Sequence, residues 1–328
     1  MKRKTVEYGK YGYLFIAPFF LVYFFFQLYP LLYTFYLSFV ESKMTQDGMS
    51  DPKFNNFENF VGILSKKDFK TGSTVWLDTN ATMSIKWTLV MWILNFIPQI
   101  LLSLLLAAWF TDTTVKLKGQ GIFKVIMYLP NIITASSIAV LFYSLFNTQG
   151  PITKILQNMH IITPEFDFMK SQAGTLGIIA FIQFWMWYGN TMVILIAGIL
   201  GINPSLYEAA MVDGANGKQQ FFKITLPLLM PILQFTLVTS AIGGLQMYDI
   251  PSLFNVNQQT GIGELGRISN TVTMQIKQYA FAVSPDYGKA AALSIVLFIF
   301  TLIISAIFFI ATKEREPKAK HAVLKGGE

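Results

Sequence analysis

Polar side chains within long apolar stretches are the residues of this sequence best placed to do chemistry. One set shares a helix face because its members stand at relative positions 0, 3, 4 and 7: Gln183, Met186, Trp187 and Asn190. A second stretch repeats that spacing with Ser240, Gly243, Gly244 and Met247. Neutral hydrogen-bonding groups beside an aromatic ring and a glycine notch suit an uncharged, polyhydroxylated ligand such as a sugar. The same residues could instead serve helix packing and interhelical hydrogen bonds, and the spacing alone favours neither reading.

Ionisable side chains are missing from the apolar stretches, and this excludes several chemistries. No Lys, Arg, Asp, Glu or His lies within them, and Asp249 stands at the end of one. Carriers driven by protons or ions usually need such groups inside the membrane. An intramembrane Ser–His enzyme is disfavoured because His160 and His321 fall outside the stretches, and the absence of cysteine removes thiolate metal sites. We therefore predict a non-catalytic chain without a metal, moving a neutral or weakly charged cargo with energy supplied by another subunit.

The elements that must position these residues are membrane helices. Hydrophobic residues make up 53% of the 328-residue chain and charged residues only 13%, a balance that a soluble globule does not need. Six apolar stretches each reach the roughly 20 residues that a bilayer requires: 13–39, 87–110, 125–146, 174–200, 227–248 and 290–312. We predict an all-α membrane protein with a transmembrane domain over 13–312, a short N-terminal segment (1–12) and a tail (313–328).

The charge distribution predicts the orientation of these helices. The two termini and the loops at 111–124 and 201–226 hold 14 basic and 7 acidic residues, whereas the opposite side holds 11 of each. Because basic residues concentrate on the cytoplasmic side, we expect both termini in the cytoplasm and the polar segment 40–85 outside, as a loop or small cap. The net charge of +7 then reflects topology and not nucleic-acid binding.

The loop at 201–226 carries signals for two short helices. Ser205 and Glu208 have the spacing of a capping box, and Pro204 stands just ahead of them. Gly214 can end the first helix in a left-handed conformation at little cost. A short amphipathic piece follows, and Pro227 marks the entry to the next membrane helix. Two short helices joined at a glycine outside a membrane suit a groove in a partner protein.

The spacing in this loop resembles the EAA loop of binding-protein-dependent ABC importer permeases, whose signature reads E-A-A, three residues, G, nine residues, I-x-L-P. Every fixed position matches, and three further residues fit the form found in sugar permeases. The residues concerned are Glu208, Ala209, Ala210, Asp213, Gly214, Ala215, Phe221, Ile224, Leu226 and Pro227. The first apolar stretch, with Pro18 and Pro30, also looks like the first of the two permeases in maltose-type systems.

The resemblance implies a six-helix type I ABC importer permease in the plasma membrane of a prokaryote. It implies a second, homologous permease subunit, two ATP-binding subunits and an extracellular solute-binding protein as partners. It places ATP and Mg on the ATPase, so this chain needs no cofactor of its own. The loop would be the coupling helix that seats in the ATPase. A stand-alone channel or facilitator for a small neutral solute is the alternative.

In maltose-type permeases the helices before and after the EAA loop line the sugar pocket. Counting from Glu208, those positions fall on the two polar sets described above. The resemblance implies an oligosaccharide as cargo. The particular sugar is left open, because the maltose side chains are not kept at Trp187, Gly243, Gly244 and Met247.

Overall fold

The computed structural model describes residues 9–45, 48–50, 52–67, 72–112, 118–256 and 269–312. The chain forms two compact units, one from residues 1–84 and 272–298 and the other from residues 85–271 and 299–328. The predicted tail and most of the N-terminal segment lie outside the described residues. Two of the three boundaries between the units fall inside long apolar helices, α4 (Asn80–Thr111) and α15 (Tyr287–Ala311).

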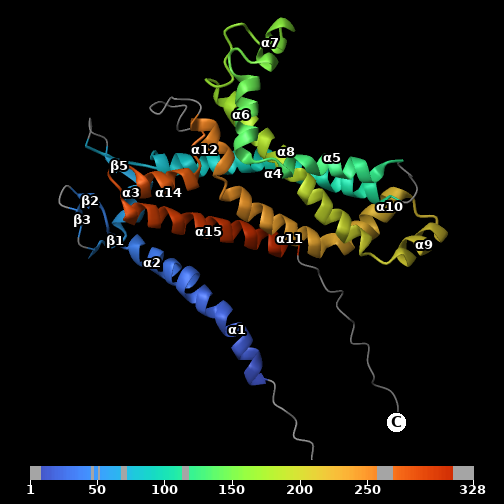
Figure 1. The fold of residues 1–328 in the computed structure, drawn as a ribbon, viewed down its shortest axis with the longest axis horizontal. Helices are drawn as coiled ribbons and strands as arrows, with labels where there is room; N and C mark the ends of the chain where they lie inside the picture. The colour runs from blue at the N-terminus through green and yellow to red at the C-terminus, as the bar shows by residue number, and fades with distance from the viewer. Residues whose placement is uncertain are drawn as a thin grey trace, which may run out of the picture. The chain divides into compact units, whose positions relative to one another are not determined.

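The first unit holds the N-terminal helix and the segment expected to form a loop or cap (Figure 1). Its helices are α1 (Gly9–Tyr23), α2 (Tyr29–Ser38), α3 (Glu58–Leu64) and α14 (Val272–Phe281). Three antiparallel ladders pair β1 (Val40–Glu41) with β4 (Lys53–Phe54), β2 (Met44–Thr45) with β3 (Gly48–Met49), and β5 (Ser65–Lys67) with β6 (Thr74–Trp76). The buried Asn59 amide secures this segment to the end of α2 by donating to the carbonyls of Ser38 and Val40, each at 2.9 Å.

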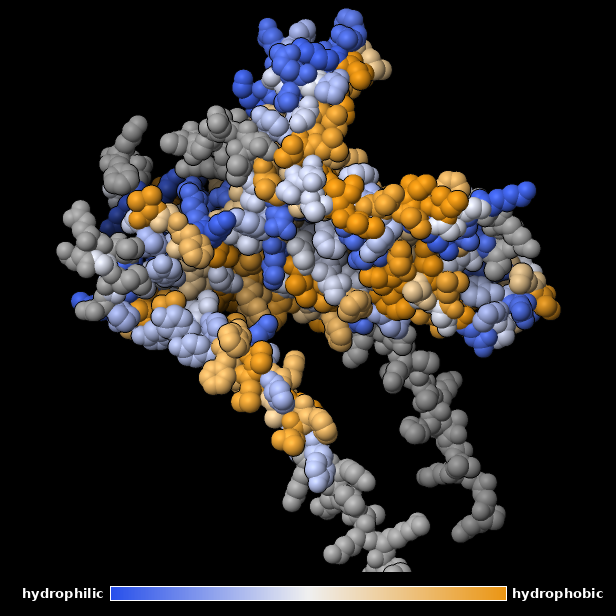
Figure 2. Space-filling model, in the orientation of Figure 1, coloured by the Kyte–Doolittle hydropathy of each residue, from blue (hydrophilic) through white to orange (hydrophobic). Residues whose placement is uncertain are grey.

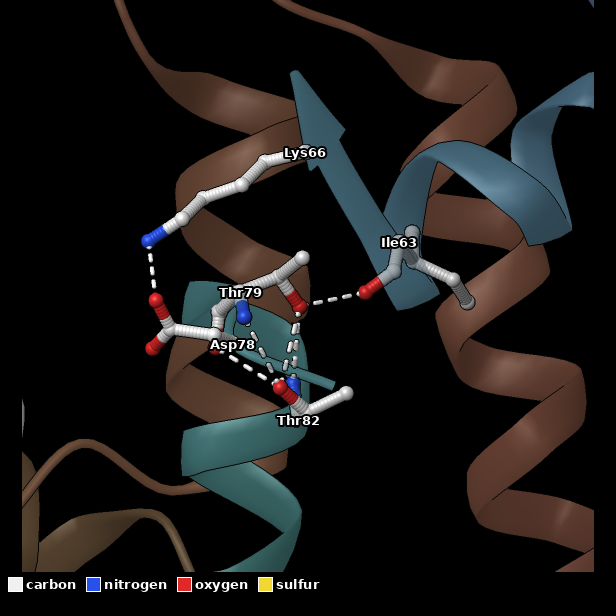
Figure 3. A network of polar contacts seen from close by, with 5 residues as sticks. All are labelled: Ile63, Lys66, Asp78, Thr79 and Thr82. Atoms are coloured by element: carbon white, nitrogen blue, oxygen red, sulfur yellow. Dashed lines mark hydrogen bonds and ion pairs between the residues drawn. The ribbon is translucent and has the colours of Figure 1, made fainter. Parts of the chain in front are cut away.

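A network of polar contacts fixes the start of α4 (Figure 3). Thr79 and Thr82 exchange hydrogen bonds: the Thr82 N–H donates to Thr79 Oγ1 at 3.1 Å, and the Thr79 N–H donates to Thr82 Oγ1 at 3.0 Å. Thr79 also donates to the Ile63 carbonyl, and Lys66 pairs with Asp78. These bonds satisfy backbone groups that a helix leaves free at its N-terminus, so the long apolar helix begins at a defined residue.

Two widened helical turns precede prolines in membrane helices. The π-helical segments η1 (Phe24–Leu28) and η2 (Phe221–Thr225) stand two residues before Pro30 and Pro227. After each segment the next backbone N–H bonds to the carbonyl five residues earlier. A proline ring clashes with the carbonyl four residues before it, and a widened turn moves that carbonyl aside. The helix can therefore continue through each proline.

The second unit contains the helices around the two polar sets. Its remaining elements are α5 (Gln120–Ile132), α6 (Ala135–Phe146), α7 (Pro151–Asn158), α8 (Gln172–Leu200), α9 (Pro204–Val212), α10 (Gly217–Gln220), α11 (Leu226–Leu245) and α12 (Asp249–Val256). Its core joins α4, α8 and α11 through residues such as Phe110, Leu195 and Leu229. Gly189 lets α5 approach α8 closely, because a Cβ there would lie 2.3 Å from the Met127 carbonyl oxygen.

Among the described residues, five helices are long and apolar enough to cross a membrane, and a bent pair makes a sixth if it is counted as one span. The pair corresponds to the predicted helix 125–146, which is not one straight helix. The chain bends by 91° between α5 and the helices that follow, where Ile133 and Thr134 are extended. Thr134 starts α6 by accepting a hydrogen bond from the Ser137 N–H. Local capping therefore overrides the apolar pattern here.

The predicted helix 227–248 also begins earlier than its prolines suggested. The helical run that could span the membrane extends from Gly217 to Phe254, because η2 links α10 directly to α11. Apolar side chains, orange in Figure 2, cover much of α1 and α2, whereas the tip formed by α7 is hydrophilic. The apolar run Tyr11–Ser38 buries nothing in its most apolar window, so its surface is left for lipid or for another protein.

Candidate functional site

The two polar sets predicted from spacing meet at one cavity. It has a volume of about 520 Å³ and lies in the second unit. All eight residues of the two sets line it: Gln183, Met186, Trp187 and Asn190 from α8, and Ser240, Gly243, Gly244 and Met247 from α11 and the turn after it. Ser171 starts α8 by accepting a hydrogen bond from the Gly174 N–H at 3.2 Å. The two helices on either side of the 201–226 loop therefore enclose a single space.

The cavity is also lined by polar residues that were not predicted from the sequence. Asn95 and Gln99 come from α4, Thr191 from α8, and Thr236 and Thr239 from α11. The spacing could have found some of them, since Thr236 stands four residues before Ser240 and Thr239 four residues before Gly243. Asn95 and Gln99 are one helical turn apart, but only the fold brings α4 to this cavity. The cavity is therefore lined by more amide and hydroxyl side chains than the two predicted sets contain.

Hydrogen bonds that join the helices are made by neighbours of the predicted residues. Gln99 Nε2 donates to Thr191 Oγ1 at 2.9 Å, and Ser103 Oγ donates to the Tyr188 carbonyl at 2.7 Å. Within the described residues, the side chains of Gln183, Asn190 and Ser240 have no hydrogen-bond partner. Among these residues, the amides of Gln183 and Asn190 do not join helices by side-chain hydrogen bonds. Their polar atoms are left for a ligand or for water.

The two adjacent glycines of α11 have different surroundings. A Cβ added at Gly243 would meet nothing within 4 Å, whereas one at Gly244 would lie 2.2 Å from Cδ1 of Trp92. Gly244 is thus a close-packing position against α4, as the packing interpretation expected, although it also borders the cavity. Trp92 is buried, and its indole N–H has no partner among the described residues.

Asp249 is the only described lining residue with a charged side chain. It follows Gln246, Met247 and Tyr248, which also line the cavity, and it is the first residue of α12. Within the part of the chain that the structure describes, no histidine, lysine or arginine is part of the lining. Among the described residues no cluster of three His, Cys, Asp or Glu side chains could hold a metal ion.

The loop between α8 and α11 forms the two predicted short helices, but its first cap differs from the prediction. The capping box at Ser205 and Glu208 is wrong: Asn203 is the N-cap, and its Oδ1 accepts a hydrogen bond from the Ser205 N–H at 3.1 Å. The cap moves because Pro204 occupies the first helical position, where its missing N–H costs nothing. Glu208 is left exposed.

Gly214 ends α9 in the left-handed conformation, with a φ of +76°. The Ala215 N–H reaches the Ala210 carbonyl at 2.8 Å, and the Gly214 N–H reaches the Met211 carbonyl at 3.1 Å. This pattern is a Schellman motif, which favours glycine at its left-handed position. The capping box of the loop occurs one helix later, where Asn216 and Gln219 bond each other's backbone N–H at 2.9 Å.

The outer surface of α9 is not covered by any other described part of the chain. Glu208, Ala209, Asp213 and Gly214 are exposed, and Val212 is 88% exposed. Ala210, Ala215, Phe221, Ile224 and Leu226 are half-buried, while Pro227 is exposed. On its inner side, Tyr207 Oη lies 2.9 Å from Thr225 Oγ1, and Thr225 is buried in η2. The loop therefore presents a small, smooth helix outward and is attached to the base of α11 by one hydroxyl pair.

Comparison with known proteins matches nearly the whole chain. Residues 13–319 match the family described as binding-protein-dependent transport system inner membrane component. The lactose transport system permease protein LacF of Rhizobium radiobacter is 29% identical over 307 residues, which are 93% of this chain and 95% of LacF. The probable ABC transporter permease protein YesP of Bacillus subtilis is 30% identical over 91% of this chain and 89% of its own length.

A solved structure shares the fold. One chain of a bacterial ABC transporter involved in the import of the acidic polysaccharide alginate superposes with a TM-score of 0.66 over 92% of this chain and 94% of that chain, at 21% identity. The same transporter in complex with a periplasmic protein that holds an alginate pentasaccharide gives a TM-score of 0.68 at 21% identity, over 92% of this chain and 93% of that chain. The predicted all-α permease fold is thereby confirmed, while the orientation of its termini stays a prediction.

Proposed function

The chain belongs to the family of binding-protein-dependent transport system inner membrane components, and from that membership we propose that it is a permease subunit of an ATP-driven sugar importer. The observation that carries the proposal is the cavity of about 520 Å³, where eight residues chosen by spacing from α8 and α11 meet. The loop that joins these two helices bears the EAA signature. The helices that line the proposed sugar path and the loop proposed to couple to the ATPase are thus consecutive in the chain.

The lining suits a neutral sugar. Amides and hydroxyls can donate to and accept from sugar hydroxyls, and Trp187, 47% exposed, offers an aromatic plane to a pyranose face. The volume lies in the usual range for small-molecule sites. LacF, which covers this chain almost from end to end, carries lactose in its name. We infer that a sugar, and specifically an oligosaccharide, passes between Gln183, Asn190 and Ser240 on its way across the membrane.

The chain forms half of the path and needs partners for the rest. A second, homologous permease would close the cavity, two ATP-binding subunits would supply energy, and an extracellular solute-binding protein would deliver the sugar. The chain itself has no catalytic role, and ATP and Mg belong to the ATP-binding subunits. The lipid bilayer surrounds the apolar helices in the plasma membrane of a prokaryote, with no part for nucleic acid.

Coupling would act through α9. Its exposed surface around Glu208 and Val212 seats in a groove of the ATP-binding subunit, and closure of the two ATP-binding subunits displaces it. Since Tyr207 joins α9 to η2 and η2 continues into α11, the displacement reaches the helix that carries Ser240 and Gly243. ATP can bias the inward- and outward-facing states only if α9 is held differently in each.

The test is ATP hydrolysis by the complex purified with its partners, measured with a panel of sugars delivered by the binding protein. We expect one class of neutral sugar to stimulate hydrolysis. Trp187→Ala combined with Asn190→Ala should raise the half-saturating sugar concentration about tenfold, because an aromatic contact and a hydrogen bond are lost. The control is Trp109→Ala, a tryptophan that is equally exposed at 46% but lies outside the cavity.

The alternative, a stand-alone channel or facilitator, gives different results. The purified chain would then bring no ATP-binding subunits through mild detergent, and sugar would enter proteoliposomes that contain this chain alone. Unchanged kinetics in the Trp187 and Asn190 double variant would remove the cavity assignment, even if hydrolysis is stimulated by sugar.

A further inference from the structure

We propose that Asp249 gives the cavity a negative electrostatic potential and excludes anionic cargo from this half of the path. This inference rests on the proposed role of the cavity as the substrate path. It adds a selectivity for charge that the neutral amides and hydroxyls of the lining cannot provide. Asp249 is thereby a specificity-determining residue.

The position of Asp249 is set by the chain turn that closes one end of the cavity. α11 ends at Leu245, and every residue from Gln246 to Ile250 lines the cavity. Asp249 lines the cavity and is exposed. Gln246, in the same turn, is exposed as well, whereas Met247 and Ile250 are buried. The polar residues of the turn are therefore accessible to water, and the apolar ones are packed in the protein.

The charge of Asp249 is not neutralised within the described part of the second unit. No ion pair joins it to a lysine there, and no basic residue lines the cavity. As the first residue of α12, it lies at the positive end of a helix dipole, which stabilises a carboxylate without a cationic partner. The helix dipole explains why an unpaired carboxylate is stable at this position. Because Asp249 lines the cavity, its charge can act on cargo that enters there.

The effect on cargo follows from the sign of the charge. A fixed carboxylate in a narrow space bounded by protein repels an anion and attracts a cation, because the surrounding protein screens the charge less than bulk water does. Neutral sugars are not repelled, and their hydroxyl groups can donate hydrogen bonds to the carboxylate. Uronic acids and sugar phosphates are disfavoured.

The experiment measures the potential directly with charged thiol reagents. The chain contains no cysteine, so a reporter can be introduced alone. Gly243→Cys is suited, because Gly243 lines the cavity and a Cβ there meets nothing within 4 Å. In the assembled complex we expect a cationic methanethiosulfonate to react faster than an anionic one of similar size. Asp249→Asn should lower that ratio of rates about tenfold, and Asp249→Glu should keep it.

Two controls distinguish an electrostatic effect of Asp249 at the cavity from a general change in reagent reactivity or in the fold. A second reporter, Glu165→Cys, is exposed outside the cavity, and its ratio should not respond to Asp249→Asn. Raising the salt concentration should reduce the ratio at Gly243→Cys, since mobile ions screen the carboxylate. The complex without either reporter gives the background from cysteines of its partners.

Two results overturn the inference. One is an equal ratio at Gly243→Cys with Asp249 and with Asp249→Asn, and the other is a thiol that neither reagent reaches. Failure of the proposed function is recognised separately: no sugar would stimulate ATP hydrolysis, while the ratio at Gly243→Cys would still respond to Asp249→Asn.

Discussion

At the scale of single residues, the two neighbouring glycines of α11 show how much one position differs from the next. The sequence assigned Gly243 and Gly244 to the same face of a helix and left open whether they serve packing or a ligand. In the fold Gly243 borders open space, while Gly244 is closed off by the ring of Trp92. One residue is therefore free to shape the cavity, and the other holds α11 against α4.

Alanine at these two positions should have opposite effects on stability. Gly243→Ala should leave the thermal stability of the purified complex unchanged or raise it slightly, because alanine favours helix by about 1 kcal/mol over glycine. Gly244→Ala should lower stability by about 1–3 kcal/mol, because its Cβ overlaps the indole. Adding Trp92→Leu should recover part of that loss. Equal melting temperatures for the two single variants would contradict the assignment.

Gly214 gives a second prediction at this scale. Alanine at Gly214 must adopt a φ of +76°, a strain of about 1 kcal/mol, and the Schellman motif that ends α9 should weaken. We expect sugar-stimulated ATP hydrolysis to fall severalfold while the amount of chain in the membrane is unchanged. Gly217→Ala is the matched control, since a Cβ there meets nothing within 4 Å and Gly217 has no positive φ. Equal losses in both variants would argue against a specific role for the turn.

At the scale of elements, α9 is attached to the membrane helix that follows it by a contact that spacing cannot reveal. Tyr207 and Thr225 are 18 residues apart, and their hydroxyl groups meet because Gly214 reverses the chain between them. Thr225 is buried in η2, where the widened turn ahead of Pro227 sets its direction. A displacement of α9 can therefore reach α11 through this contact as well as along the chain.

A double-mutant cycle tests this connection. Tyr207→Phe and Thr225→Val should each reduce the stimulation of ATP hydrolysis by sugar, and the double variant should be no worse than either single one. The interaction energy should be about 1 kcal/mol, the usual value for a neutral hydrogen bond. Thr225→Ser keeps the hydroxyl and should retain stimulation. Additive losses in the double variant would show that the pair does not act as a unit.

One break between helices was not predicted from the apolar pattern of the sequence. The stretch 125–146 is mostly apolar and has no charged residue, yet it bends by 91° where Thr134 begins a new helix. The signal was present as Thr134 followed by Ser136 and Ser137, a group typical of a helix start. A prediction from the length of an apolar stretch does not take such an N-cap into account.

At the scale of the whole molecule, the orientation in the membrane decides whether the proposed coupling is possible. The excess of positive charge predicts that α9 and both termini are cytoplasmic and that α7 is external. Because the chain lacks cysteine, single reporters can map this on intact cells. We expect a membrane-impermeant thiol reagent to label Glu165→Cys without lysis and Glu208→Cys only after lysis. Labelling of Glu208→Cys on unbroken cells would make contact with a cytoplasmic ATPase impossible.

The sequence by itself determined the family, the two polar sets and the two short helices of the 201–226 loop. Membrane helices must exclude charged residues, and the end of a short helix at a glycine depends on local backbone conformation. Both features can therefore be predicted from residues that are neighbours in the sequence. Only the tertiary structure decided that Asn95 and Gln99 join the cavity, that Gly244 packs against Trp92, and that Tyr207 meets Thr225. These contacts join residues far apart in the chain, and no local pattern encodes which helix faces which.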